Sequence, residues 1–259
     1  MSSDTRVFVA GAAGVIGRVL CQLLVEDGWQ VTGTTRRAER ARALEALGVQ
    51  PVIVDVFDAE ALRTAVLHAR PTAVVHQLTD LPQRWDSAAR EEVLASNALV
   101  REVGSQHLVD AAVAAGVATM VAQSIAFVYA PGPLPHREED PLDVDAADPV
   151  TRRTVRAVRL LEHLVLGAPF RGVVLRYGQL YGPGTWASEP PAGAPLHVHA
   201  AADAARRALF RGEAGIYNVA EPDGAVTVDK AMRALGWSPA FRVRDGGEDN
   251  AAVELPTSG

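Results

Sequence analysis

Three glycines near the amino terminus have a spacing that suits phosphate binding. Gly11 and Gly14 lie between an apolar run, residues 7–10, and residues 16–24, in which apolar side chains recur at helical spacing; Gly17 lies at the start of this helical stretch. In such a strand–turn–helix unit the first glycine permits the tight turn, the second lets the backbone approach a pyrophosphate, and the third allows close packing of the helix. An ordinary tight loop is the alternative. The pattern predicts a nucleotide site that is lined by Gly11, Ala13, Gly14, Val15, Ile16 and Gly17.

Charged residues after the next two strands indicate which nucleotide is bound. Arg36 and Arg37 follow the predicted strand 29–34, where an acidic residue would bind the adenosine ribose of NAD and an arginine can hold the 2′-phosphate of NADP. The pattern therefore favours NADP over NAD, and a solvated first turn of the following helix is the alternative. Asp55 ends the predicted strand 51–55 and is placed to bind the adenine amino group, with Val56 beside it.

The ends of three further strands are expected to line the cofactor. Residues 73–79 run into the cleft, so His76, Gln77 and Leu78 should lie beside the cofactor; for His76 a catalytic base is the alternative. Strand 119–124 ends at Ser124, and strand 173–176 is followed by Tyr177. Strands that alternate with helices predict an α/β fold of the Rossmann type, a doubly wound parallel sheet whose ligand lies at the carboxyl ends of the strands.

Composition limits the classes of protein to consider. The chain has 259 residues, of which 48% are hydrophobic, so it can bury a substantial core as one large domain or slightly more. A net charge of -6 argues against nucleic acid or an anionic membrane as the main partner. Cys21 is the only cysteine, and we expect no metal site. A signal peptide and a membrane-spanning run are not apparent, so we expect a cytoplasmic protein with a small-molecule substrate.

The predicted organisation has three parts. Residues 1–184 form the NADP-binding domain, residues 185–242 contain a small substrate cap although part of the sheet returns there, and residues 243–259 form a disordered tail. Within the first part we expect a long helical segment over 86–115, broken near Ser96 and Asn97, then a loop over 129–149 and a helix over 150–166.

Taken together, these motifs resemble the extended short-chain dehydrogenase/reductase family, the NAD(P)-dependent sugar epimerases and dehydratases. The resemblance covers about residues 6–220 and rests on the glycine turn, Arg36, Asp55, Val128-Tyr129 and the run Leu-Arg-Tyr-Gly-Gln-Leu-Tyr-Gly-Pro-Gly that ends at Gly184. It implies a Rossmann domain, a small carboxyl-terminal cap, a homodimer through helices 86–115 and 150–166, and a catalytic serine or threonine after the fifth strand. It also implies a Tyr-x-x-x-Lys pair, whose tyrosine is the general acid or base.

The chain departs from this family pattern at its catalytic positions. It has four tyrosines, none followed four places later by lysine, and Lys230 is its only lysine. An alignment on Glu162 puts Thr154 and Val158 at the Tyr and Lys positions, and neither can perform the proton transfer. The family's serine position is Ile125, one place after Ser124, and its asparagine position is Arg101.

Other side chains therefore have to be considered as acid or base. We expect Tyr129 first, because it directly follows the fifth strand, and then Ser124 and Tyr181; a packed aromatic is the alternative for Tyr129. His197 and His199 would share one face of a strand, with no further ligand nearby to complete a metal site.

Two functions are compatible with these observations. The first is an NADP-binding enzyme of the epimerase/dehydratase type, an oxidoreductase or isomerase that acts on a small or sugar-like substrate with a non-standard acid or base. The alternative is a catalytically inactive, NADP-sensing binding protein of the same fold. The short segment after Gly184 favours a small substrate over a large nucleotide sugar.

Overall fold

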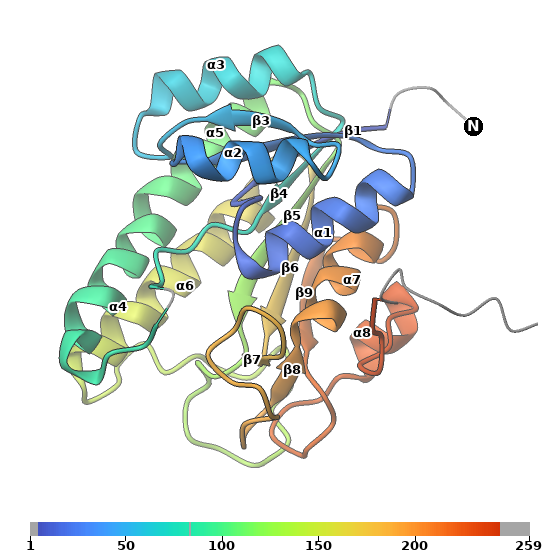
Figure 1. Ribbon diagram of the computed structural model, residues 1–259. Helices are drawn as coiled ribbons and strands as arrows, with labels where there is room; N and C mark the ends of the chain where they lie inside the picture. The colour runs from blue at the N-terminus through green and yellow to red at the C-terminus, as the bar shows by residue number, and fades with distance from the viewer. Residues whose placement is uncertain (1–4, 83, 244–259) are drawn as a thin grey trace, which may run out of the picture.

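A computed structural model describes residues 5–82 and 84–243 of the protein (Figure 1). Its centre is a seven-stranded sheet in the order β3-β2-β1-β4-β5-β6-β9, and every neighbouring pair is parallel. The strands are β1 (Arg6–Ala10), β2 (Gln30–Thr35), β3 (Gln50–Ile53), β4 (Ala73–His76), β5 (Thr119–Ile125), β6 (Arg171–Tyr177) and β9 (Gly215–Val219). The predicted doubly wound parallel sheet is confirmed.

Helices cover both faces of this sheet because successive strand residues point to opposite sides. On β1, Val7 and Val9 belong to the core under α1 (Val15–Glu26), α2 (Ala38–Glu45) and α7 (Val198–Ala208). Phe8 and Ala10 belong to the core under α3 (Ala59–Ala69), α5 (Ser105–Ala114) and α6 (Pro149–Gly167). Figure 1 shows α1 and α7 packed side by side on one face of the sheet.

The predicted helical segment over 86–115 is irregular at a different place than expected. A short 3-10 turn (η1, Ser87–Ala89) leads into α4 (Arg90–Leu99), and a π-helical turn (η2, Val100–Gly104) joins α4 to α5. The break predicted at Ser96 and Asn97 is wrong. Asn97 is helical, and its side-chain oxygen accepts a hydrogen bond from the backbone of Asp80 at 3.0 Å, outside the helix, so this oxygen does not compete for the helix backbone.

The last part of the chain contributes to both the sheet and a small addition to it. Strands β7 (Gln179–Tyr181) and β8 (Pro195–His197) form a separate parallel pair, while β9 joins the main sheet and α8 (Asp229–Leu235) follows it. The strand over His197 and His199 is wrong, because α7 begins at Val198 and the His197 ring accepts a hydrogen bond from the His199 backbone as its cap. The division at residue 184 stays a prediction, and nearly all of the predicted tail lies outside the described residues.

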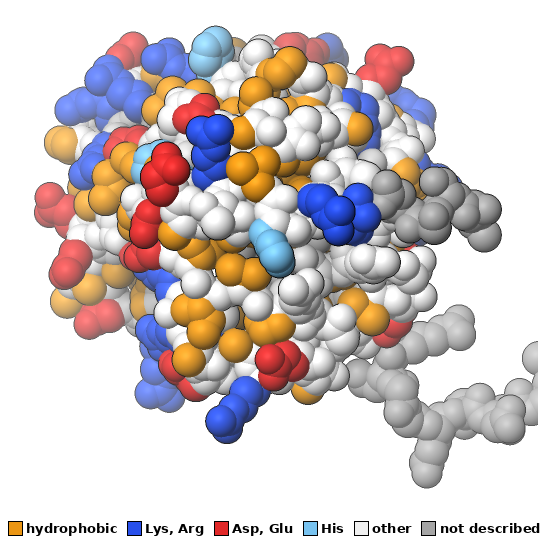
Figure 2. All heavy atoms as spheres, turned by 90° about the horizontal axis from the view of Figure 1, so that it is seen from above, with side chains coloured by type: hydrophobic (Ala, Val, Ile, Leu, Met, Phe, Trp, Pro, Cys, Tyr) orange, Lys and Arg blue, Asp and Glu red, His pale blue; other side chains and the backbone are white. Residues whose placement is uncertain are grey.

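Two surface features bear on possible partners. On the face that carries α3, basic and acidic side chains lie beside one another and do not form a field of one sign (Figure 2). Within the described ranges, no helix combines the length and the apolar character that a bilayer span requires.

Candidate active site

The glycine turn after β1 leaves no room for side chains. Gly11 has a φ of +87°, and a Cβ there would lie 2.4 Å from the carbonyl oxygen of Gln77. A Cβ on Gly17 would lie 2.2 Å from the carbonyl oxygen of Gly11. The first contact joins the ends of β1 and β4, and the second seats α1 on the turn. The spacing of the glycines thus has the steric cause expected of a dinucleotide turn.

The amino terminus of α1 is left open for an anion. Gly14 caps it in an extended conformation, no side chain provides a cap hydrogen bond, and no acidic residue lies in the first turn. The first backbone N–H groups of a helix lack acceptors within the helix, so a pyrophosphate can take them. Ala13, Val15 and Ile16 can contribute through the backbone, since the Ile16 side chain is buried in the core. The turn therefore fits a dinucleotide.

Arg36 lies at the corner where the adenosine end of such a cofactor would be selected. Its side chain is 50% exposed, and one terminal nitrogen lies 2.5 Å from one carboxylate oxygen of Asp80, whose other oxygen accepts a hydrogen bond from Ser96. Burial of the Asp80 carboxyl raises its pKa, but the bonds from Ser96 and Arg36 outweigh burial and the net pKa is lowered. Arg37 is exposed beside Arg36. A 2′-phosphate would compete with Asp80 for Arg36.

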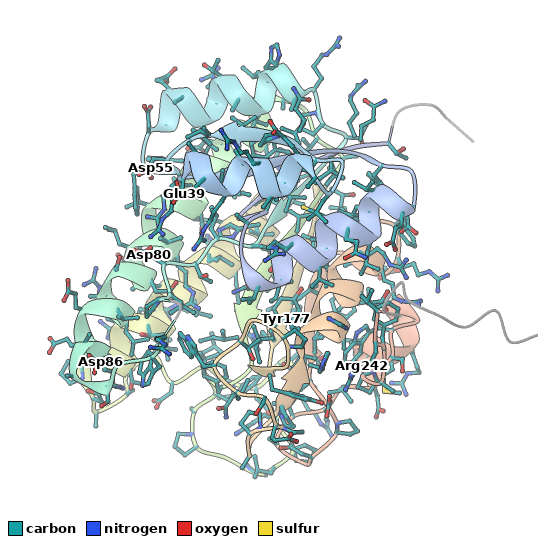
Figure 3. All side chains as sticks on the ribbon, in the orientation of Figure 1. Glu39, Asp55, Asp80, Asp86, Tyr177 and Arg242 are labelled. Atoms are coloured by element: carbon teal, nitrogen blue, oxygen red, sulfur yellow. The ribbon has the colours of Figure 1, made fainter. Side chains whose placement is uncertain are left out.

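Asp55 and Val56 lie at the neighbouring strand end. Asp55 accepts a hydrogen bond from the Phe57 backbone at 3.0 Å, and buried Val56 would contact a Cβ on Gly104. Figure 3 shows Asp55, Glu39 and Asp80 on the same side of the molecule. Val54 donates its backbone N–H to the carbonyl oxygen of Thr35 at 3.1 Å, so the ends of β3 and β2, which carry Asp55 and Arg36, lie side by side.

The three residues predicted at the end of β4 divide between the two faces of the sheet. His76 is fully buried and pairs with the Ser105 hydroxyl at 2.9 Å, and burial lowers its pKa to about 4. Gln77 lies 3.4 Å from the Tyr177 hydroxyl through its amide nitrogen, and its buried amide oxygen has no described partner. Leu78 donates its backbone N–H to His76. A fully buried neutral imidazole is more consistent with a lining residue than with a base.

An ion pair is buried at the ends of β5 and β6. Arg176 donates two hydrogen bonds to Glu162, at 2.8 and 2.7 Å, and the Ser124 hydroxyl donates to the same carboxylate at 2.7 Å. Exposure of these three residues is only 1–4%. Ser124 therefore holds Glu162, and its hydroxyl proton is already used.

Tyr129 belongs to the same network. Its hydroxyl donates to Asn218 at 2.6 Å and accepts from Arg176 at 2.9 Å, while its ring stacks on His136 at 4.9 Å between centroids. Burial raises the Tyr129 pKa although Arg176 opposes this shift. A phenol with a raised pKa that already has a donor and an acceptor is poorly prepared to act as a base.

Tyr181 and Tyr177 do not share the Tyr129 network. The Tyr181 hydroxyl donates to Glu221 at 2.6 Å and accepts from Arg242 at 3.0 Å. The Tyr177 hydroxyl donates to the carbonyl oxygen of Ala201 at 3.1 Å. Figure 3 shows Tyr177 near the centre of the molecule and Arg242 toward its edge. Of the predicted catalytic residues, the structure brings together only Tyr129 and Ser124.

The positions of the missing pair carry small or apolar side chains. Thr154 and Val158 lie on α6, two turns and one turn before Glu162 respectively; Val158 is fully buried, and the buried Thr154 hydroxyl has no described partner. Arg101, on the π turn packed against α6, is 5% exposed. Sequence reasoning did not count Arg101 as a site residue, although an arginine in place of the family's asparagine was the available signal.

Two loops meet beside the glycine turn. The Trp186 indole donates to the carbonyl oxygen of Pro82 at 3.0 Å, and its ring lies 5.1 Å from that of Trp85. A Cβ on Gly184 would lie 3.5 Å from the Val15 side chain, so the segment after β7 faces the start of α1. Aromatic side chains thus bridge the loops after β4 and β7. The described residues contain no cluster of three or more potential metal ligands.

Comparison with known proteins agrees with this geometry. The model of the NAD dependent epimerase/dehydratase family matches residues 7–220. The chain is 45% identical over 252 residues to a Streptomyces protein named 3-diazoavenalumate denitrifying reductase, covering 97% of this chain and 79% of that protein.

Solved structures show the same fold. A UDP-glucose 4-epimerase from Thermotoga maritima superposes with a TM-score of 0.75 at 17% identity, covering 92% of this chain and 94% of that one. A UDP-glucose 4-epimerase from Thermus thermophilus, solved with NAD, has a TM-score of 0.69 at 25% identity and covers 91% and 85% of the two chains.

Proposed function

This chain is a member of the NAD-dependent epimerase/dehydratase family, and we propose that it is an NADPH-dependent reductase of a small diazo-bearing acid. The chain is an NAD(P)-dependent enzyme of the oxidoreductase or epimerase type, as its family and its relatives show. The diazo substrate is suggested by the Streptomyces relative, whose name describes a denitrifying reduction of a diazo acid. A catalytically inactive sensor is not favoured by these comparisons.

One observation carries the proposal: the positions of the general acid pair hold Thr154 and Val158. Interconversion of an alcohol and a ketone needs a proton donor or acceptor at oxygen, and loss of that group costs about 10²–10⁴ in rate. A diazonium group, R–N₂⁺, that gains one hydride and loses N₂ becomes R–H, and no oxygen gains or loses a proton. A chain that lacks the pair is suited to this reaction.

The residues present divide the work between cofactor and substrate. When bound, the reduced nicotinamide supplies the hydride. The glycine turn and the start of α1 would hold the pyrophosphate, while Arg36 and Arg37 would hold the 2′-phosphate and favour NADP over NAD. The buried network of Ser124, Glu162 and Arg176 joins the ends of β5 and β6 to α6 beside the site.

The reaction can be tested with an isotope. The protein is incubated with diazotised 4-aminobenzoate and NADPH deuterated at one or the other C4 position, and nitrogen release and label in the benzoate product are measured. We expect nitrogen release equal to NADPH consumed, with deuterium transferred from only one of the two labelled cofactors. Equal transfer from both, which is the result of the uncatalysed reaction, or no turnover, contradicts the proposal. UDP-glucose serves as the control substrate and should not react.

The remaining expectations stay predictions. A homodimer through α4 and α6 would cover Leu99 and Leu160, which are 41% and 40% exposed on those helices. Light scattering in solution decides this point. Localisation in the cytoplasm is likewise an expectation from the sequence.

A further inference from the structure

Arg101 is a buried cation without a hydrogen-bonding partner in the part of the chain that the structure describes. It is 5% exposed, and Glu162 acts on its guanidinium through charge, but no hydrogen bond or salt bridge joins the guanidinium to another residue in the ranges 5–82 and 84–243. A buried charge is costly unless it is paired and hydrogen-bonded, and guanidinium stays protonated across the ordinary pH range. A position of this kind calls for an anion from outside the chain.

The charges around Arg101 do not neutralise it. Glu162 acts on it electrostatically, but both carboxylate oxygens of Glu162 are already bonded to Arg176. His76, on which Arg101 also acts, has a pKa of about 4 and is neutral at pH 7. The Glu138 carboxylate accepts from the Asn218 backbone and is not among the charges that act on Arg101. The fully buried part of the site therefore holds two guanidinium groups against one carboxylate.

A second polar group without a partner lies on the helix that packs against Arg101. The Thr154 hydroxyl is buried and unbonded among the described residues. Thr154, Val158 and Glu162 follow at intervals of four on α6, so they share one face of the helix, and α6 contacts the π turn that carries Arg101. Two donors of low exposure, one of them charged, thus lie on the π turn and on α6, which pack against each other.

We propose that Arg101 binds the carboxylate of the substrate, with the Thr154 hydroxyl available to the same group. This inference rests on the proposed reduction of a small acid. The planar fork of a guanidinium matches a carboxylate through two parallel hydrogen bonds. The apolar Val158 leaves this cation without the competition that the family's lysine would bring. Arg101 is then a specificity residue, and the acid group that it holds orients the rest of the substrate.

Binding measured without turnover tests the inference independently of the reaction. The protein saturated with NADPH is titrated with benzoate and with its neutral counterpart benzamide, in the wild type, Arg101→Met, Arg101→Lys and Arg153→Met. Arg153 is the matched control, because its side chain is 48% exposed and pairs with Glu102 at the surface. We expect Arg101→Met to weaken benzoate binding about 10- to 100-fold and benzamide binding hardly at all. The benzoate affinity of Arg101→Lys should fall between those of the wild type and Arg101→Met, and Arg153→Met should bind benzoate as tightly as the wild type does.

Folding provides a second readout. Removal of an unpaired buried cation should raise the melting temperature of the ligand-free protein, by about 2–4 °C for each kcal/mol gained. Unchanged benzoate affinity in Arg101→Met, or a wild type that does not distinguish benzoate from benzamide, overturns the inference. Selective benzoate binding without diazo reduction would instead overturn the proposed reaction and leave Arg101 as a carboxylate-binding residue.

Discussion

Glu162 is the side chain on which the buried polar groups of the active site converge. Its carboxylate accepts hydrogen bonds from Ser124 and from two nitrogens of Arg176, and its removal would leave the buried Arg176 without an ion-pair partner. We expect Glu162→Gln to lower the free energy of unfolding by about 3–5 kcal/mol. Urea unfolding followed by tryptophan fluorescence measures this change. Glu102→Gln, which removes a surface partner of Arg153, should cost less than about 1 kcal/mol, and similar losses in both variants would contradict the argument.

Tyr129 distinguishes proton-transfer chemistry from direct reduction. Its hydroxyl is occupied by Asn218 and Arg176, and burial raises its pKa. We expect Tyr129→Phe to keep kcat for diazo reduction within about tenfold of the wild type, because that reaction needs no acid at oxygen. A loss of about 10²–10⁴ in kcat would identify Tyr129 as the general acid predicted from the sequence. Steady-state kinetics with one diazo substrate is sufficient.

His76 makes stability depend on pH. Burial lowers its pKa from 6.5 to about 4, so as the pH falls the unfolded chain takes up a proton before the folded chain does. The free energy of unfolding should therefore decrease between about pH 6.5 and 4, by about 3 kcal/mol from this group, and its contribution should be constant below that window. Unfolding at several pH values, compared with His76→Gln, isolates the slope. An identical slope in both proteins would show that other groups cause it.

At the scale of the elements, the corner between β2 and α2 decides which cofactor is held. Arg36 is half exposed and paired with Asp80, so it can turn to a phosphate at small cost. We expect Arg36→Ala to raise the Kd for NADPH about tenfold or more, a loss of about 1.4 kcal/mol, and to leave the Kd for NADH within about twofold. Titration calorimetry measures both.

The matched control for this corner is Arg42→Ala, an exposed arginine later on α2. It carries the same charge near the site but lies beyond the end of β2. If it weakened NADPH binding as much as Arg36→Ala does, a general electrostatic effect would explain the result and the specific role of Arg36 would fail.

The π turn between α4 and α5 is an irregular element beside the active site. Such turns are frequent at functional sites because they change the direction of a side chain without ending the helix. Here the turn carries Arg101 into the interior beside α6. The element thus supplies the cation that α6, with Val158 in the lysine position, does not provide.

For the whole molecule, the two cores share one sheet. Residues of α7 and β9, both from the predicted cap part of the chain, belong to the core that also contains α1 and β1. We therefore expect one cooperative thermal transition for residues 5–243. NADPH at 100 times its Kd should raise the free energy of unfolding by about 2.7 kcal/mol and so move this transition to a higher temperature. Calorimetry with and without NADPH checks both points. A separate transition for the segment after residue 184 would show that it folds as its own domain.

The sequence by itself determined the fold class, the glycine turn and the absence of the Tyr-x-x-x-Lys pair. These features depend on local patterns. Buried parallel strands are short apolar runs, and glycine is required where a Cβ would meet Gln77 or Gly11. The absence of the pair follows from the sequence itself, because its only lysine is Lys230. The same patterns placed the predicted cofactor residues at the ends of strands, where the structure also has them. Their contacts with a cofactor stay predictions.

Only the tertiary structure decided which polar side chains are already satisfied and which are not. Ser124 and Tyr129 are bonded to partners 38 and 89 residues away, Glu162 and Asn218, whereas the Thr154 hydroxyl has no partner among the described residues and Arg101 is met only by the charge of Glu162. The physical reason is that hydrogen-bond partners and the loss of solvent arise from packing between distant elements. The type of a side chain determines which hydrogen bonds it can donate or accept. Its neighbours in the folded protein determine whether those donors and acceptors are still free to bind a ligand.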